Sequence, residues 1–114
     1  QVAGTVALTE AGGDVARMRD VYNERRVYLI SALRDIGLKI ATEPTGAFYV
    51  FADASHWGAD SLELSYRLLS EAGVATAPGI DFGPGGEGFI RLNFGCTRET
   101  LVEGLERIKL ALQE

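Results

Sequence analysis

The sequence predicts an α+β fold in which helices pack on one face of a small, mainly antiparallel sheet of three to four strands. Three segments carry apolar residues at steps of three and four, as amphipathic helices do. Between them lie short runs of β-branched and aromatic residues bounded by Pro or Gly, which is typical of strands. At 114 residues with 46% hydrophobic composition, the chain is long enough to form one compact core.

The first long helix is expected to begin at Asp14, which can cap it, and to run to Ile36. Gly37 then supplies the residue most easily placed in the left-handed conformation that ends a helix. The apolar stripe of this helix comprises Val15, Met18, Tyr22, Leu29, Leu33 and Ile36. We interpret residues 1–13, which are small and helix-tolerant, as the end of a preceding element, and residues 14–114 as one domain.

A short apolar run over residues 38–42 and a Pro- and Gly-containing break over residues 43–46 follow this helix. They lead into a strand predicted over residues 47–51, where aromatic and β-branched residues follow the turn. An aspartate with a glutamate three residues later then opens a second helix, which is expected to span residues 60–72. Gly73 is expected to end it.

A short strand is predicted over residues 74–77, closed by Pro78 and Gly79. Residues 79–88 contain five of the fourteen glycines and are therefore expected to form a loop. The clearest strand follows over residues 89–94, because apolar and other side chains alternate along it. Thr97 is expected to cap a final helix, whose apolar stripe comprises Leu101, Leu105, Ile108 and Leu112.

Arg91 is the strongest candidate for a functional residue. It lies in the middle of the last predicted strand, on the face opposite Ile90 and Leu92, which should meet the helices. A guanidinium held on a strand can present two parallel donors to a carboxylate, a geometry that lysine cannot reproduce. The alternative reading is a solvent-exposed or ion-paired arginine on an open sheet face.

Other features of the sequence narrow the class of function. A net charge of −5 and a pI near 4.9 argue against nucleic acid or an anionic membrane as partner. We find no transmembrane stretch and no signal peptide in this sequence. A single cysteine cannot form an internal disulfide. These two observations favour a cytoplasmic location. We expect no metal site, a surface position for His56 and a buried structural role for Cys96. The glycine-rich loop lacks the strand and helix context of a nucleotide-binding fingerprint.

Three segments, in order and spacing, carry a resemblance to a known family. They are EPTGAFYVF at residues 43–51, GVATAPGIDFG at residues 73–83 and GFIRLNFG at residues 88–95. Together they resemble the C-terminal small domain of class I/II, fold-type-I aminotransferases, which depend on pyridoxal phosphate. The resemblance covers essentially the whole chain.

The resemblance implies roles for particular residues. In this family the arginine of the last strand binds the α-carboxylate of the amino-acid substrate, and the matching position is Arg91. Two segments that border the active-site cleft in relatives contain Gly46, Gly79, Phe82 and Gly83, which are therefore expected to shape its entrance. No residue of this chain is assigned a catalytic or cofactor-binding role.

The resemblance also implies what lies outside this chain. Relatives hold pyridoxal phosphate on a lysine of their large domain, and neither Lys39 nor Lys109 stands in a matching context. We therefore expect the fragment to bind no cofactor and to be inactive alone. In the intact enzyme it would be joined to a large domain. That enzyme would act on an amino acid and a 2-oxo acid and would form a homodimer. A related lyase or synthase would use the same arginine. The alternative is a free-standing α+β ligand-binding or interaction module without catalytic activity.

Overall fold

The computed structural model describes residues 1–113, which form four helices, three strands and three short 3-10 turns. The helices and strands, in chain order, are α1 (Val2–Thr9), α2 (Gly12–Ile36), β1 (Tyr49–Asp53), α3 (Ser61–Ala72), β2 (Ala77–Pro78), β3 (Phe89–Asn93) and α4 (Arg98–Gln113). The 3-10 turns cover Ser55–Trp57, Gly79–Phe82 and Pro84–Gly86. None of the helices among the described residues is both long enough and apolar enough to cross a lipid bilayer.

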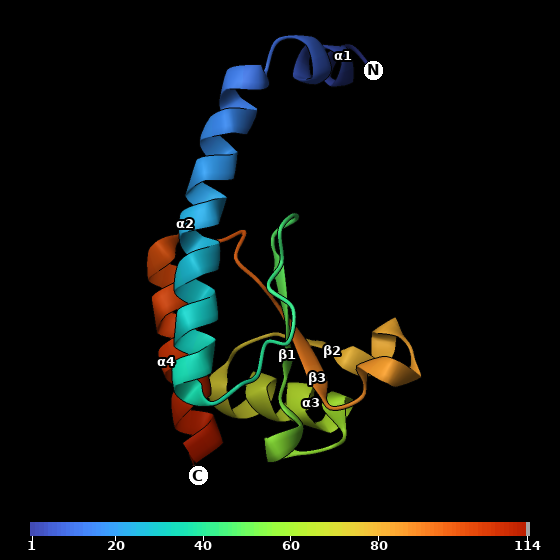
Figure 1. Ribbon diagram of the computed structural model, residues 1–114, viewed down its shortest axis with the longest axis vertical. Helices are drawn as coiled ribbons and strands as arrows, with labels where there is room; N and C mark the ends of the chain where they lie inside the picture. The colour runs from blue at the N-terminus through green and yellow to red at the C-terminus, as the bar shows by residue number, and fades with distance from the viewer. Residues whose placement is uncertain (114) are drawn as a thin grey trace.

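The three strands form one antiparallel sheet in the order β1-β3-β2, which confirms the predicted fold class. In Figure 1, α2 and α4 lie side by side, and α3 runs crosswise to them at the level of their lower halves. Because β3 lies between the other two strands, Arg91 pairs with Phe51 of β1 on one side and with Ala77 of β2 on the other. The sheet therefore holds the backbone of Arg91 from both sides.

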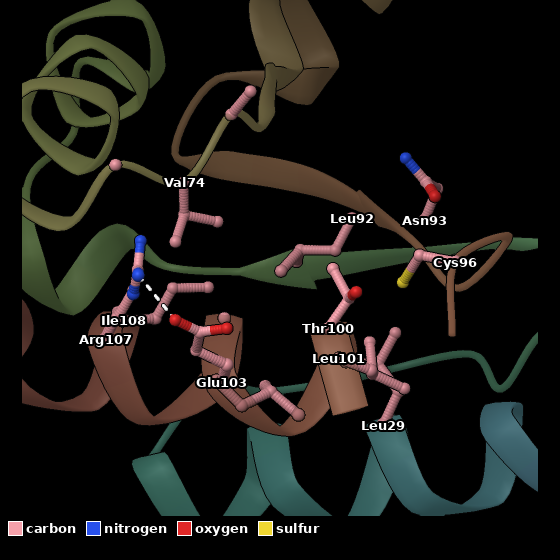
Figure 2. Close-up of a pocket in the computed structure, with 14 residues that line it drawn as sticks. Leu29, Val74, Leu92, Asn93, Cys96, Thr100, Leu101, Glu103, Arg107 and Ile108 are labelled. Carbon is pink, nitrogen blue, oxygen red and sulfur yellow. Dashed lines mark hydrogen bonds and ion pairs between the residues drawn. The ribbon is translucent and has the colours of Figure 1, made fainter. Parts of the chain in front are cut away.

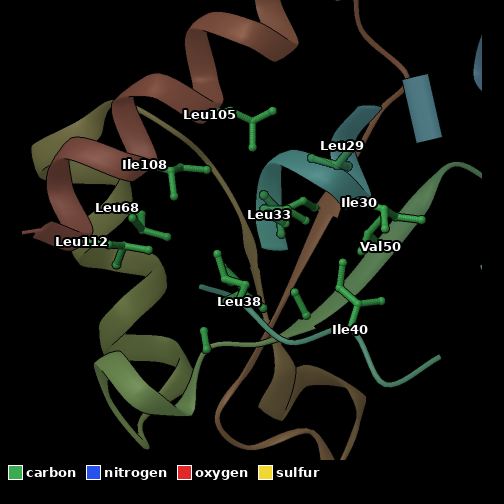
Figure 3. Close-up of a cluster of buried hydrophobic side chains, with 14 of the residues drawn as sticks. Leu29, Ile30, Leu33, Leu38, Ile40, Val50, Leu68, Leu105, Ile108 and Leu112 are labelled. Carbon is green, nitrogen blue, oxygen red and sulfur yellow. The ribbon is translucent and has the colours of Figure 1, made fainter. Parts of the chain in front are cut away.

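The core lies between the helices and one face of the sheet (Figure 3). On that face the alternate residues Val50, Ala52 and Ile90 are completely buried, and Leu92 is nearly so. The helices bury Leu29 and Leu33 from α2, Leu64 and Leu68 from α3, and Leu101, Leu105, Ile108 and Leu112 from α4. The apolar stripe predicted for the last helix is thus confirmed, as is the side of β3 that meets the helices.

Most helix ends lie where their capping residues predicted them. The Asp60 carboxylate accepts a hydrogen bond from the Glu63 backbone N–H at 2.9 Å, and Gly73 ends α3 with a φ of 64°. Gly37 ends α2 with a φ of 108°, and Thr97 Oγ1 accepts from the Thr100 N–H at the start of α4. These ends are set by contacts within one helical turn, so sequence reasoning could locate them.

The start of α2 differs from the prediction. The helix begins at Gly12, and Asp14 does not cap it but pairs with Arg17 inside its first turns. Val15 and Met18 of the predicted stripe are 59% and 53% exposed. These two residues are exposed because α2 is longer than the sheet. Its first half extends beyond the sheet, where the core of the described residues does not cover them (Figure 1).

Two strands are displaced from their predicted positions. β1 begins at Tyr49, since Ala47 has a φ of 57°, which is incompatible with an extended strand. β2 contains only two residues, Ala77 and Pro78. Val74, where the strand was predicted to begin, belongs to the end of α3, because its N–H bonds to the Leu68 carbonyl. The apolar run over residues 38–42 contributes a single bridge, between Lys39 and Asp53.

Candidate functional site

The face of the sheet that does not meet the helices carries several aromatic side chains and, on its central strand, Arg91. Alternation along β1 places Tyr49 and Phe51 there, and alternation along β3 places Phe89 and Arg91 there. Phe51 is 37% exposed although its neighbours Val50 and Ala52 are completely buried. We call this surface the open face.

The Arg91 guanidinium lies between two aromatic rings. Its central carbon is 4.3 Å from the centroid of the Tyr49 ring and 4.7 Å from that of the Phe82 ring. Within residues 1–113, no aspartate or glutamate forms an ion pair with it. Arg91 is therefore a half-buried cation that lies over two aromatic rings and forms no ion pair within residues 1–113.

The rings beside Arg91 belong to a longer row. On one side Phe82 meets Phe51 edge to face at 5.8 Å, and Phe51 stacks on Phe89 at 4.9 Å with an interplanar angle of 6°. On the other side Tyr49 contacts Phe48 at 4.3 Å. The Phe82–Phe51 and Phe51–Phe89 centroid separations lie in the range of favourable aromatic pairs, and the Tyr49–Phe48 separation is slightly shorter. Each ring next to Arg91 therefore packs against another ring.

The glycine-rich loop brings Phe82 to this position. Gly79 and Gly86 cross so closely that a Cβ added to Gly79 would lie 1.9 Å from the Gly86 carbonyl oxygen. The loop is tied to α3, because the buried Ser61 hydroxyl accepts a hydrogen bond from the Ile80 N–H at 3.1 Å. The positive φ of Gly83, 105°, then turns the chain away after Phe82.

Glu87 closes the same loop on α3. Its carboxylate accepts from the Ser61 backbone N–H at 2.6 Å and from the Gly88 N–H at 3.2 Å. These hydrogen bonds, that from the Ser61 N–H first, hold the pKa of Glu87 below its ordinary value. The carboxylate thus stays ionised and fastens the loop that carries Phe82.

Of the predicted site residues, the structure brings Phe82 to Arg91 and places Gly79 and Gly83 at the two ends of the same 3-10 turn. Gly46 lies elsewhere. It lines a hollow of about 330 Å³ together with Met18 and Tyr22 of α2.

Two residues of β1 that neighbour Arg91 were not among the sequence-predicted candidates: Tyr49, whose ring lies under the guanidinium, and Phe51, which pairs with Arg91 across the sheet. The aromatic composition of residues 48–51 was visible in the sequence. Their proximity to Arg91 depends on the register between β1 and β3, for which the sequence carries no local signal.

The remaining candidates do not form a second reactive centre. His56 is exposed, as predicted, and its ring meets Trp57 edge to face at 5.4 Å. Cys96, predicted as a buried structural thiol, is half-buried and packs against the core, so its burial is only partial. It borders a hollow of about 290 Å³ whose floor includes Leu29 and Leu92, and Figure 2 shows no acid or base beside its sulfur among the side chains drawn. Because Cys96 follows β3 just before α4, only part of its surface reaches the core.

The described residues do not by themselves fit pyridoxal phosphate. Lys39 lies beside Asp53 at the edge of the sheet, with β1 between it and Arg91, and Lys109 is exposed on α4.

Comparison with known proteins gives consistent matches along the chain. The family model described as "Aminotransferase class I and II" matches residues 1–108. A probable N-acetyl-LL-diaminopimelate aminotransferase of Bacillus subtilis is 41% identical over 96% of this chain and 28% of its own length. An aspartate aminotransferase of Pyrococcus horikoshii is 40% identical over 99% of this chain and 29% of its own length.

Solved structures agree in fold. The crystal structure of an aromatic aminotransferase from Pyrococcus horikoshii superposes with a TM-score of 0.87 at 35% identity, over 92% of this chain and 28% of that one. The chain thus spans under a third of the length of the relatives it matches.

Proposed function

This chain belongs to the class I and II aminotransferase family, and from that membership we propose that it is the small, C-terminal domain of a pyridoxal-phosphate-dependent aminotransferase. The enzyme would move an amino group between an α-amino acid and a 2-oxo acid. In this proposal Arg91 binds the substrate α-carboxylate, residues 14–114 form the domain, and residues 1–13 end a preceding element.

The observation that carries the proposal is the environment of Arg91. The guanidinium stands on the central strand, faces away from the helices and has no ion-pair partner within residues 1–113. A bound carboxylate would supply the missing negative charge and accept two parallel N–H donors. The alternative is a solvent-exposed or ion-paired arginine. Against it stand the half-burial of Arg91 and the lack of an acid partner within residues 1–113.

Arg91 would act by positioning. It would hold the substrate by its carboxylate, away from the bond that breaks, and so fix the orientation of the reacting carbon. Pyridoxal phosphate, when bound, supplies the electron sink for the reaction. Since the described residues do not fit that group, we assign its site to the rest of the enzyme, with which this domain would pair in a cytoplasmic homodimer. The isolated chain would then be inactive.

Kinetics of the full-length enzyme test the proposal. Removing one partner of a buried charge pair costs roughly 2–5 kcal/mol, so Arg91→Ala should lower kcat/KM by about thirtyfold to a few thousandfold. Arg91→Lys should recover little of this loss, because an ammonium lacks the two parallel donors. Arg107→Ala is the matched control, since Arg107 pairs with Glu103 on α4.

Two results would contradict the proposal. One is an Arg91→Ala enzyme whose kinetics equal those of the wild type. The other is a purified full-length protein without the absorbance band of lysine-bound pyridoxal phosphate, which would favour the free-standing binding module.

A further inference from the structure

We propose that Tyr49 and Phe82 are positioning residues that hold the Arg91 guanidinium in its carboxylate-binding orientation, a role that rests on the proposed function of Arg91. The two rings lie 4.3 and 4.7 Å from the guanidinium carbon. We call the pair the aromatic clamp.

The clamp holds Arg91 from both sides of β3. Tyr49 comes from β1, and Phe82 follows β2, which pairs with the opposite edge of β3. An arginine side chain has several rotatable bonds, and fixing it in one conformation has a large entropic cost. If the side chain becomes ordered only when the ligand binds, this cost lowers the binding affinity. Rings that contact the guanidinium in the free chain order the side chain before the ligand binds, so less entropy is lost on binding.

Aromatic rings suit this task better than an acid would. A ring attracts a guanidinium through its face and leaves the N–H edge available for a carboxylate. An internal aspartate or glutamate would also order Arg91, but it would occupy the same N–H donors and compete with the ligand. The absence of an acid partner within residues 1–113 and the presence of two rings therefore indicate one arrangement, a cation that is ordered and still free to bind.

The clamp is itself supported. Phe82 is 52% exposed, yet it rests on Phe51, which stacks in turn on Phe89. Tyr49 rests on Phe48. Packing against the core does not account for the positions of the two clamp rings, because neither ring lies in the core.

The expected effect is on binding of the substrate carboxylate. An exposed to partly desolvated cation–π contact corresponds to about a threefold to thirtyfold change in an equilibrium constant. In the full-length enzyme, Tyr49→Leu and Phe82→Leu should therefore each raise KM for the preferred amino acid by about that factor, with kcat changed less. Tyr49→Phe keeps the ring and should restore KM to near the wild-type value.

A double-mutant cycle separates positioning from a general effect on folding. If the rings act through Arg91, Tyr49→Leu should add little to the KM of the Arg91→Ala enzyme, whereas independent structural damage would add in full. Tyr66→Leu is the control, because Tyr66 is a 65% exposed aromatic residue on α3 without contact to Arg91. Circular dichroism and the thermal midpoint of each variant establish that it is folded.

The outcomes distinguish the two proposals. If Arg91→Ala raises KM and the clamp variants do not, or if their effects add in full, the clamp is overturned while the function of Arg91 stands. If Arg91→Ala leaves kcat/KM unchanged, the carboxylate role falls and the clamp falls with it.

Discussion

The crossing of Gly79 and Gly86 makes the glycine-rich loop sensitive to one methyl group. A Cβ on Gly79 would lie 1.9 Å from the Gly86 oxygen and 2.7 Å from the Phe89 oxygen. Restoring a 3.0 Å contact requires the Gly79 and Gly86 backbones to separate by about 1 Å. Both obstructing atoms are backbone oxygens, so no side chain can rotate to relieve the overlap. Gly79→Ala should therefore destabilise the fold by about 1–3 kcal/mol, the usual cost of overpacking.

The matched control is Gly85→Ala in the same loop. A Cβ on Gly85 would meet nothing within 4 Å, and its φ is not positive, so its effect should stay within about 0.5 kcal/mol. Urea unfolding of the 114-residue chain, followed by the fluorescence of its single tryptophan, Trp57, measures both variants. Gly79→Ala should also lower the thermal midpoint by about 4–8 °C per kcal/mol lost. Equal stability of the two variants would refute the assigned crossing.

Two further substitutions test contacts that fasten the sheet and helices together. The depressed pKa of Glu87 means that its stabilising contribution is complete above its ordinary pKa of 4.5 and is lost as pH falls through the lower folded value. The unfolding midpoint of wild type should therefore exceed that of Glu87→Gln at pH 7, and the difference should shrink as pH falls below 4.5. A difference that is independent of pH would contradict the ionised contact. Trp57→Phe removes the indole N–H that donates to the Leu112 carbonyl at 2.9 Å and should cost about 0.5–1.5 kcal/mol in urea unfolding followed by circular dichroism. Equal midpoints for Trp57→Phe and wild type would show that this carbonyl is satisfied otherwise.

Local signals explain which parts of the fold the sequence could predict. The ends of α3 depend on Asp60 and Gly73, each of which acts within one turn of its own helix. The side of β3 on which Ile90 and Leu92 lie depends only on alternation along the strand. Such features were predicted correctly, because no distant residue has to be known.

Features that depend on distant residues were misplaced. The positive φ of Ala47 delays the start of β1, although alanine carries no preference for that conformation. Val15 and Met18 follow the same helical period as Leu29 and Leu33, yet only the latter two lie above the sheet. Periodicity identifies the apolar side of a helix, but burial also requires another element opposite it.

The candidate site combines both kinds of information. The position of Arg91 on the open face follows from alternation, and it was predicted from β3 alone. Its contacts require two long-range facts: the register that brings Tyr49 of β1 near it, and the crossing of Gly79 and Gly86 that folds Phe82 over it. The strand thus fixes which way the guanidinium faces, and the loop and the neighbouring strand fix how firmly it is held. A substitution at Gly79 should for that reason affect substrate KM as well as stability, because it moves the loop that carries one ring of the clamp.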